Sequence, residues 1–349
     1  MRGRLNNSVS VRAQGDVYTL WKSLNELLGS HNSKTTITLN LHNRRARSIS
    51  HGVLEVLVET ASTHIDWKLK LNGVNITREF KPLYVIEFPE LNKYLCKFVY
   101  DITGLLNTDE AISREWANLT IKHEGGDSFS LKGLLLNAIY DDPEATSIYS
   151  HVTGLLLLEQ GEEYTYNLEQ FLNSGSLHAK LVLYTPRAGR AKISTESGTE
   201  IITLPHSQVE EHVIISSSPV KYIKITPELN EKTPNYIVIS SITVYNTQLK
   251  TPHLDIESIE TSRQESNIRI KLRIVNRGES RPDRVVMSVF NRGVLLGMYK
   301  SSGSKYEPGV VVEEEFAVSV PPEISELTLR LAWSKLTKTM FVDKKLFLK

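Results

Sequence analysis

Hydrophobic and polar residues alternate one by one along most of this chain. Residues 65–71, 177–183 and 268–274 each place an apolar side chain at every second position, and all the positions between them except Val182 are polar. This period of two is typical of strands that bury one face and solvate the other. The pattern predicts a mainly β protein of tandem antiparallel β-sandwiches, jelly-roll-like and then immunoglobulin-like. It also predicts that Trp67 and Trp333 are buried.

One segment near the N-terminus has a helical period instead. Apolar side chains recur there at steps of three and four, at Val17, Leu20, Trp21, Leu24, Leu27 and Leu28. Asp16 is a suitable N-cap and Gly29 a suitable stop signal. The spacing therefore predicts one short amphipathic helix over residues 16–29.

The length of the chain indicates more than one domain. A chain of 349 residues corresponds to two or three domains of ordinary size. We expect an N-terminal segment over 1–33, a β-sandwich over 34–163, and a second sandwich, or the remainder of the first, over 164–250. Residues 251–349 have the ~100-residue length of one immunoglobulin-like sandwich.

Composition and charge narrow the classes of partner. The chain has 41 Lys and Arg against 40 Asp and Glu, a balance that supplies no general attraction for nucleic acid or for an anionic membrane. We therefore expect neither nucleic acid binding nor membrane insertion. No signal peptide and no apolar run of membrane-spanning length is visible in the sequence as given, which reads as cytoplasmic.

Few residues form recognisable catalytic groupings. The sequence contains no His-Glu-x-x-His metal motif, no Gly-x-Ser-x-Gly elbow and no glycine-rich phosphate loop. The single cysteine, Cys96, excludes an intramolecular disulfide and a four-cysteine zinc site, and its alternation with aromatic residues predicts a core position. These observations favour a protein that is not an enzyme and that holds no cofactor.

An acidic cluster is the candidate for a metal site. Asp141, Asp142 and Glu144 follow the apolar run 134–140, and their carboxylates are the ligand type that calcium prefers. Their spacing does not match an EF-hand, and aspartates also stabilise turns at strand ends. Calcium binding and a plain turn remain the two interpretations.

Aromatic and basic residues offer two further candidates. Trp116, Tyr140 and Tyr149 are candidate ligand-binding residues, because aromatic rings beside carboxylates are suited to sugars, although such rings are also ordinary core residues. Arg44, Arg45 and Arg47 form a basic patch in one loop. Such a patch contacts phosphate in some proteins and is simply solvated in others.

The C-terminal hundred residues carry a family resemblance. An apolar strand over 268–275 ends in Asn276-Arg277-Gly278, a second strand over 285–290 ends in Asn291-Arg292-Gly293, and a late strand covers 327–333. This arrangement resembles a CARDB-type domain, the immunoglobulin-like module of prokaryotic cell-surface and adhesion-related proteins.

Residues 65–160 resemble a second family. Tyr100-Asp101-Ile102-Thr103, and the run 134–140 leading into Asp141-Asp142-Pro143, are similar to an uncharacterised sandwich domain of archaeal surface proteins. The two resemblances imply a non-catalytic role at the cell surface, whereas the sequence as given has no export signal.

Three hypotheses for function follow. The first is a structural or interaction protein that binds a protein partner, or itself, through sandwich edges or end loops. The second is a carbohydrate-binding module protein at the cell surface. The third is a hydrolase built on a β-sandwich scaffold, which would need a cleft that holds histidine and acidic residues.

Overall fold

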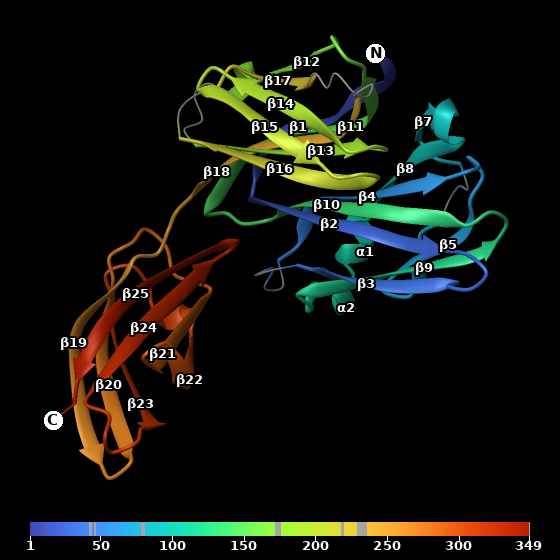
Figure 1. Ribbon diagram of the computed structural model, residues 1–349. Helices are drawn as coiled ribbons and strands as arrows, with labels where there is room; N and C mark the ends of the chain where they lie inside the picture. The colour runs from blue at the N-terminus through green and yellow to red at the C-terminus, as the bar shows by residue number, and fades with distance from the viewer. Residues whose placement is uncertain are drawn as a thin grey trace. The chain divides into compact units, whose positions relative to one another are not determined.

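The computed structural model describes residues 1–41, 44, 47–77, 81–171, 176–217, 220–228 and 236–348. These residues form antiparallel sheets and very little helix, which confirms the predicted mainly β fold (Figure 1). The chain divides into two compact units. Among the described residues, unit 1 holds residues 1–41 and those from 47 to 248, and unit 2 holds Arg44 and residues 249–348.

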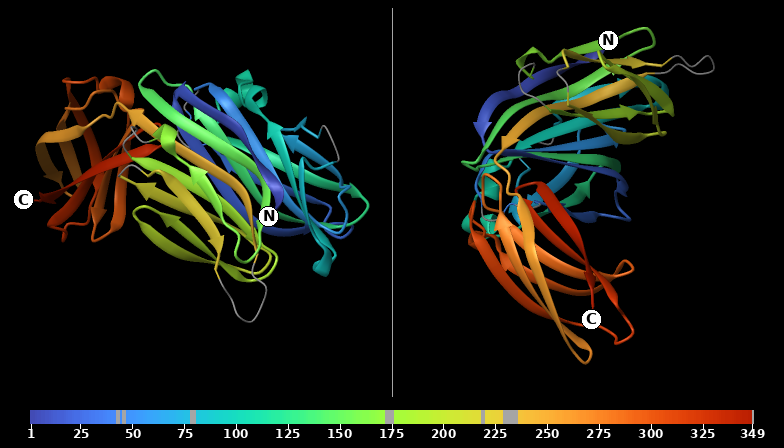
Figure 2. Two further views of the ribbon diagram at one scale, coloured as in Figure 1. Left: turned by 90° about the horizontal axis from the view of Figure 1, so that it is seen from above. Right: turned by 90° about the vertical axis from the view of Figure 1, so that its left-hand side faces the viewer.

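Unit 1 is built from sheets stacked in the order C, B, A, D (Figures 1 and 2). Sheet C contains β3 (Lys34–Asn40), β9 (Trp116–Gly125), β5 (Asp66–Leu71) and β6 (Val74–Asn75). Sheet B contains β2 (Asp16–Leu28), β10 (Phe129–Tyr140), β4 (Ile49–Thr60), β8 (Lys93–Asp101) and β7 (Tyr84–Phe88).

The other half of unit 1 has the same two-sheet design. Sheet A contains β1 (Arg2–Gln14), β11 (Ala145–Leu158), β18 (Ile237–Leu249), β13 (Leu177–Thr185) and β16 (Gln208–Ser216). Sheet D contains β12 (Tyr164–Asn167), β17 (Tyr222–Pro227), β14 (Gly189–Thr195) and β15 (Gly198–Leu204). The sequence boundary expected at residue 163 falls inside this second sandwich, because β11 lies in sheet A.

Short helical turns fill the connections. They are η1 (Pro89–Leu91), α1 (Thr103–Leu106), α2 (Asp109–Ile112), η2 (Glu169–Phe171) and η3 (Gly303–Lys305). Within the described ranges, these helices are too short to cross a bilayer.

Three layers of hydrophobic contact hold unit 1 together. Between sheets C and B, the Trp67 ring lies 4.5 Å from that of Phe98 and 5.4 Å from that of Phe129. Between sheets B and A, a cluster joins Leu57 and Leu135 to side chains of β11, β13 and β18. A further cluster fills the space between sheets A and D. Sheets A and B are therefore covered on both faces, and their strands contain long buried runs.

The predicted helix over residues 16–29 is wrong. These residues form β2, which pairs with β10 from Asp16 opposite Tyr140 to Leu28 opposite Phe129. Apolar side chains occur on both sides of β2 because its first residues are buried on both faces, between other sheets. A register shift between Ser23 and Glu26 then changes the phase of the alternation, so the apolar positions fall at steps of three and four, and pairing with β10 overrides the local helical preference.

Unit 2 is a two-sheet sandwich. Sheet E contains β19 (Leu254–Gln264), β20 (Asn267–Asn276) and β23 (Val311–Ser319). Sheet F contains β22 (Val294–Ser302), β21 (Arg284–Asn291), β24 (Glu326–Lys335) and β25 (Lys338–Phe347). Inward residues of both sheets form one core. Trp333 lies in that core at 4% exposure and Trp67 in unit 1 is 1% exposed, so both tryptophan predictions are confirmed.

Candidate functional site

Strand β8 has two neighbours along only part of its length. On one side, β4 pairs with β8 from Thr60 opposite Tyr94 to Val53 opposite Asp101. On the other side, β7 pairs with it only as far as Tyr84 opposite Lys97. In the part of the chain that the structure describes, the last residues of β8 therefore lack a second partner strand.

The hydrogen-bond pattern shows which backbone groups face this open edge. The Lys97 carbonyl accepts a bond of 2.9 Å from the Leu83 N–H on the β7 side. On the β4 side, the Ile102 N–H donates to the Gly52 carbonyl at 2.9 Å. Backbone groups of successive residues point to opposite sides of a strand, so Val99 directs its N–H and C=O to the same side as Lys97. Val99 thus presents a donor and an acceptor at the open edge.

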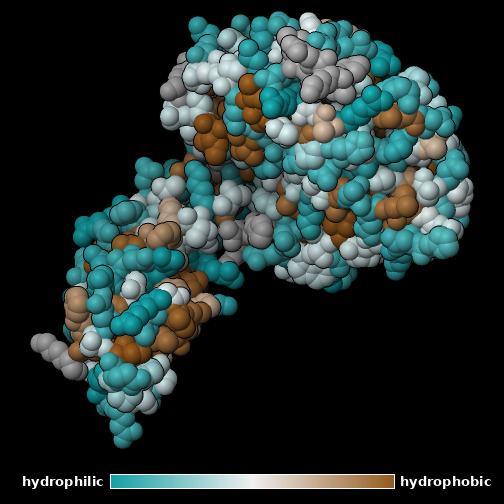
Figure 3. Space-filling model, viewed as in Figure 1, coloured by the Kyte–Doolittle hydropathy of each residue, from teal (hydrophilic) through white to brown (hydrophobic). Residues whose placement is uncertain are grey.

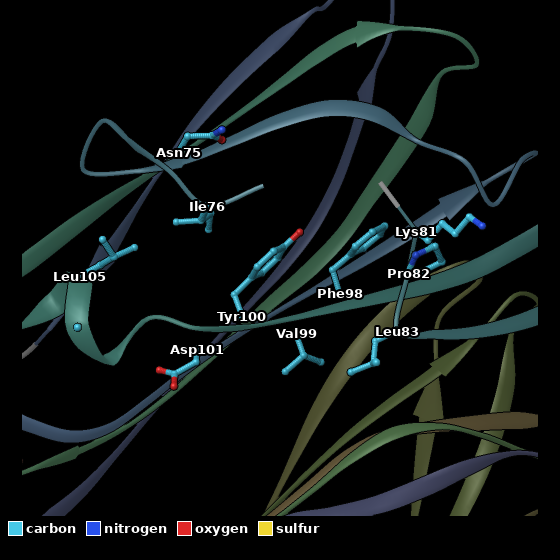
Figure 4. A pocket seen from close by; sticks show the side chains of 11 residues that line it. Asn75, Ile76, Lys81, Pro82, Leu83, Phe98, Val99, Tyr100, Asp101 and Leu105 are labelled. Atoms are coloured by element: carbon cyan, nitrogen blue, oxygen red, sulfur yellow. The ribbon is translucent and has the colours of Figure 1, made fainter. Parts of the chain in front are cut away.

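A cavity of about 700 Å³ lies beside this edge (Figure 4). Ile76, Phe98 and Leu105 supply apolar walls, while Lys81 and Asp101 bring charge to its margins. The cavity combines apolar surface with a few polar groups, as sites for peptides and small molecules commonly do.

Tyr100 is a buried polar residue in the wall of the cavity. Its side chain is 8% exposed, and among the described residues its hydroxyl has no hydrogen-bond partner. Figure 4 shows its ring standing between Ile76 and Phe98. Burial raises the pKa of the Tyr100 phenol, so the hydroxyl keeps its proton at neutral pH. A buried hydroxyl without a partner is costly, and an acceptor on a bound molecule would remove that cost.

Local hydrogen bonds fix the chain that follows β8. The Asp101 carboxylate accepts from the Thr103 N–H at 2.9 Å, which starts the turn into α1. At the other end of α1, the Asn107 side chain accepts from the Ile49 N–H and donates to the Ile49 carbonyl, both at 2.8 Å. The open edge is therefore held in place by β4 and by the turn that follows it.

A second polar cluster lies sealed between sheets A and B. Glu55, Lys97 and His151 are all fully buried. Lys97 Nζ lies 2.7 Å from one Glu55 oxygen, and His151 Nε2 lies 2.8 Å from the other. Asn137 Nδ2, which only donates, faces His151 Nδ1 at 3.2 Å, and this places the ring proton on Nε2.

Neighbouring groups supply further hydrogen bonds to this buried ion pair. Lys97 also donates to the Ser240 carbonyl at 2.7 Å and to the Ser241 hydroxyl at 2.9 Å. Burial alone would raise the pKa of Glu55, but Lys97 and His151 outweigh it and hold that pKa far below its usual range. Burial lowers the pKa of Lys97, and Glu55 opposes part of that change. The arrangement joins one sheet to the other.

The acidic candidates bond within their own turn and to the loop that contains Arg47 and Ser48. Asp142 forms an ion pair of 2.8 Å with Arg47 and accepts from the Glu144 N–H, while Asp141 accepts from the Ser48 hydroxyl. Within the described ranges, no three His, Cys, Asp or Glu side chains are grouped as metal ligands. These contacts explain the acids as turn and loop anchors.

The aromatic candidates separate into buried and exposed residues. Tyr140 and Tyr149 are fully buried, so neither offers a ring face to a sugar. Trp116 is 40% exposed, and the Arg114 guanidinium lies over its ring at 5.0 Å.

The basic candidates do not form one solvated patch of described side chains. Arg44 is buried and Arg47 is paired with Asp142, whereas Arg45 lies outside the described residues. Cys96 is buried in sheet B as predicted, and burial raises the pKa of its thiol to about 12.

Sequence reasoning missed the buried ion pair and the open edge. A signal for the first was present: Glu55 and Lys97 are single charges inside the apolar runs 53–58 and 95–100, and His151 interrupts another. A charge at the centre of such a run must be paired inside the fold. The open edge leaves no such trace, because it depends on where β7 separates from β8.

Comparisons with known proteins give no family. No protein-family model matches the chain, and no curated protein matches it. Among solved structures, the β-glucuronidase of Ruminococcus gnavus in complex with uronic deoxynojirimycin is 10% identical, with 57% of this chain and 36% of that chain covered and a TM-score of 0.22. The apo form of that enzyme is 9% identical, with 58% and 36% covered and the same TM-score of 0.22.

The chain spans little more than a third of the length of those enzymes. Similarity this weak leaves the function of this chain to be argued from its own residues.

Proposed function

We propose that this protein is a non-catalytic interaction protein that binds an extended segment of a protein partner at the open edge of β8. The observation that carries the proposal is that β7 pairs with β8 only as far as Lys97, which leaves the edge at Val99 without a ladder partner among the described strands, beside the cavity lined by Val99 and Tyr100. The partner segment adds one strand to sheet B where β7 stops.

The chemistry of the edge selects a peptide as the bound molecule. An exposed strand edge presents alternating N–H and C=O groups, and another extended backbone matches that spacing. The cavity then receives a side chain of the added strand between Ile76 and Leu105, with the Tyr100 hydroxyl as hydrogen-bond donor. Backbone bonds supply the general affinity and the cavity supplies the selectivity.

The arrangement of titratable groups supports a binding role over a hydrolytic one. Glu55, Lys97 and His151 bond one another inside the A–B interface. The acid and base of a hydrolase must reach a substrate in a cleft. The resemblances to a CARDB-type module and to an archaeal surface domain point in the same direction, towards interaction at the cell surface.

Carbohydrate binding is the second candidate. The Asn75 carboxamide and the Asp101 carboxylate lie at the same cavity as Tyr100, and these groups hydrogen-bond sugars as well as peptides. A sugar would use the side chains of the cavity and would make little use of the Val99 backbone. That difference separates the two candidates experimentally.

Site-specific photocrosslinking in the native host tests the proposal. A photoreactive residue replaces Leu83, which lines the cavity at 57% exposure. The matched control carries the same residue at Ile201, which is 51% exposed on β15. We expect one protein to be crosslinked from position 83 and not from position 201.

A second substitution identifies the mode of binding. Val99→Pro removes the outward N–H while edge positions of sheets accept proline, so the fold is retained. The crosslink from position 83 should then disappear. A crosslink that survives Val99→Pro would refute strand addition. If the parent protein and the Val99→Pro variant both bind a glycan equally well, and neither binds a protein, the carbohydrate candidate is established instead.

A further inference from the structure

The two outer faces of unit 2 differ in chemistry. On sheet E, charged side chains pair across strands, with Arg269 at 3.3 Å from Glu315 and Lys271 at 3.2 Å from Glu313. On sheet F, several outward positions carry large apolar side chains instead. We call this surface the F face and define it by Phe290, Leu295, Met298, Arg330 and Phe341.

The residues of the F face are outward neighbours in the strand register. Arg330 lies opposite Ser288, which lies opposite Met298, and Phe290 lies opposite Leu295. Phe341 is 58% exposed, Met298 53% and Leu295 48%. Figure 3 shows hydrophobic side chains gathered over the strands of this sheet. Leu295 and Met298 lie on edge strand β22 and Phe341 lies on the opposite edge strand β25, with Phe290 and Arg330 on the strands between them. Several exposed apolar side chains on one sheet face mark an interaction surface more strongly than a single one does.

Arg330 is held rigidly at the centre of the F face. Its guanidinium donates two bonds of 2.8 Å to the Asp343 carboxylate. The same guanidinium lies 4.2 Å from the centre of the Phe341 ring and 5.6 Å from that of Phe290. An arginine fixed between aromatic rings loses little side-chain freedom on binding, and arginine and aromatic residues are enriched at interface hot spots.

The charge around the F face is positive. The four strands of sheet F carry seven Lys or Arg residues, of which Lys335 is buried, and two Asp or Glu residues. Both acidic residues are paired within the sheet, Asp343 with Arg330 and Glu326 with Lys345. Arg284 and Lys300 are exposed, and the described residues place no acidic partner beside them. The rim is therefore ready for an acidic surface.

We infer that the F face is a second docking surface, distinct from the edge of β8, and that it binds a protein segment with apolar anchors flanked by Asp or Glu. A second copy of this chain fits less well, because a twofold contact through this face sets the same positive rim against itself. A lipid surface also fits less well, because insertion would bury the Asp343 carboxylate in hydrocarbon.

Selection from a random-peptide display library on the full chain tests the inference. We expect selected peptides to carry a large apolar residue beside Asp or Glu and to bind more weakly as salt increases. Phe341→Ser, at an exposed position, should weaken them about 30-fold or more, the loss typical of a hot spot. Arg269→Ala on the paired face of sheet E is the matched control and should leave binding unchanged.

Each other outcome would overturn the inference. Peptides that bind Phe341→Ser and the parent equally, or that lack acidic residues, would place the site elsewhere. Peptides that no longer bind the Val99→Pro variant but still bind the Phe341→Ser variant would have their site at the edge of β8. A dimer in sedimentation, or co-sedimentation with phosphatidylserine vesicles, that Phe341→Ser abolishes would assign the F face to self-association or to membranes.

Discussion

The ion pair between Glu55 and Lys97 allows a sharp test of how the two halves of unit 1 are joined. Both side chains are fully buried, Glu55 and Lys97 come from sheet B, and their bonds reach Ser240 and Ser241 of sheet A. Replacing Lys97 by Met retains the volume and the unbranched shape of the side chain. It removes the positive charge and leaves the Glu55 carboxylate buried with neutral donors only.

The expected loss is large because the remaining charge cannot reach water. Breaking a buried pair by removing one partner costs about 3–5 kcal/mol. At about 2–4 °C per kcal/mol for a unit of this size, the melting temperature should fall by roughly 6–20 °C. In the double variant Glu55→Gln/Lys97→Met, the carboxamide still accepts from His151 and no charge is stranded. The double variant should therefore be more stable than Lys97→Met.

Urea unfolding measures these differences. Tryptophan fluorescence reports mainly on unit 1, which contains Trp21, Trp67 and Trp116. The control is Lys224→Met, which breaks a partly exposed pair with Glu163 of 3.1 Å in the same unit and should cost less than about 1 kcal/mol. Two results would refute a coupled buried pair. One is a loss of unfolding free energy below about 1 kcal/mol for Lys97→Met. The other is a double variant whose loss equals the sum of the losses of Lys97→Met and Glu55→Gln.

Three further predictions concern unit 1. Trp67→Ala should cost about 3–5 kcal/mol in urea unfolding, and a variant that unfolds like the parent would contradict the packing of Trp67 against Phe98. Burial alone would raise the pKa of Glu59, but hydrogen bonds from Lys93, Tyr184 and Ser207 outweigh it and lower that pKa. The ionised Glu59 therefore stabilises the fold fully above about pH 4.3, the pKa of an unperturbed glutamate. This stabilisation is lost as the pH falls through the lowered pKa of the folded protein. Glu59→Gln should flatten the acid limb of stability against pH, and an unchanged limb would argue against these bonds. The Cys96 thiol, with its pKa raised to about 12, should react with a thiol reagent only on unfolding, so rapid native labelling would mean that sheet B opens.

Much of the fold could be predicted from alternation alone. The strands around Trp67 and Leu272 bury every second side chain, and each was evident as a period of two. The segment 16–28 could not be read in this way, because sheets cover both faces of its first residues and blur the period. A local pattern records how many faces are buried, and it does not record which distant strand will cover them.

The candidate site was harder to predict for a related reason. Tyr100 and Asp101 were noted only for a family resemblance, and the structure places both at the cavity. Tyr140 and Tyr149 were chosen for their chemistry, and the structure buries both. Aromatic residues near a strand end are equally suited to a core and to a binding surface. Strand pairing separates these cases, and pairing is a long-range property.

The buried pair and the open edge are connected through β8. Lys97 is the last residue of β8 that pairs with β7, and its side chain is held by sheet A. Val99 follows two residues later at the open edge, so its backbone is fixed before any partner arrives. An edge fixed in this way loses little conformational entropy when a strand is added. A Lys97→Met protein that still folds should therefore bind the proposed partner segment more weakly, although residue 97 does not touch that segment.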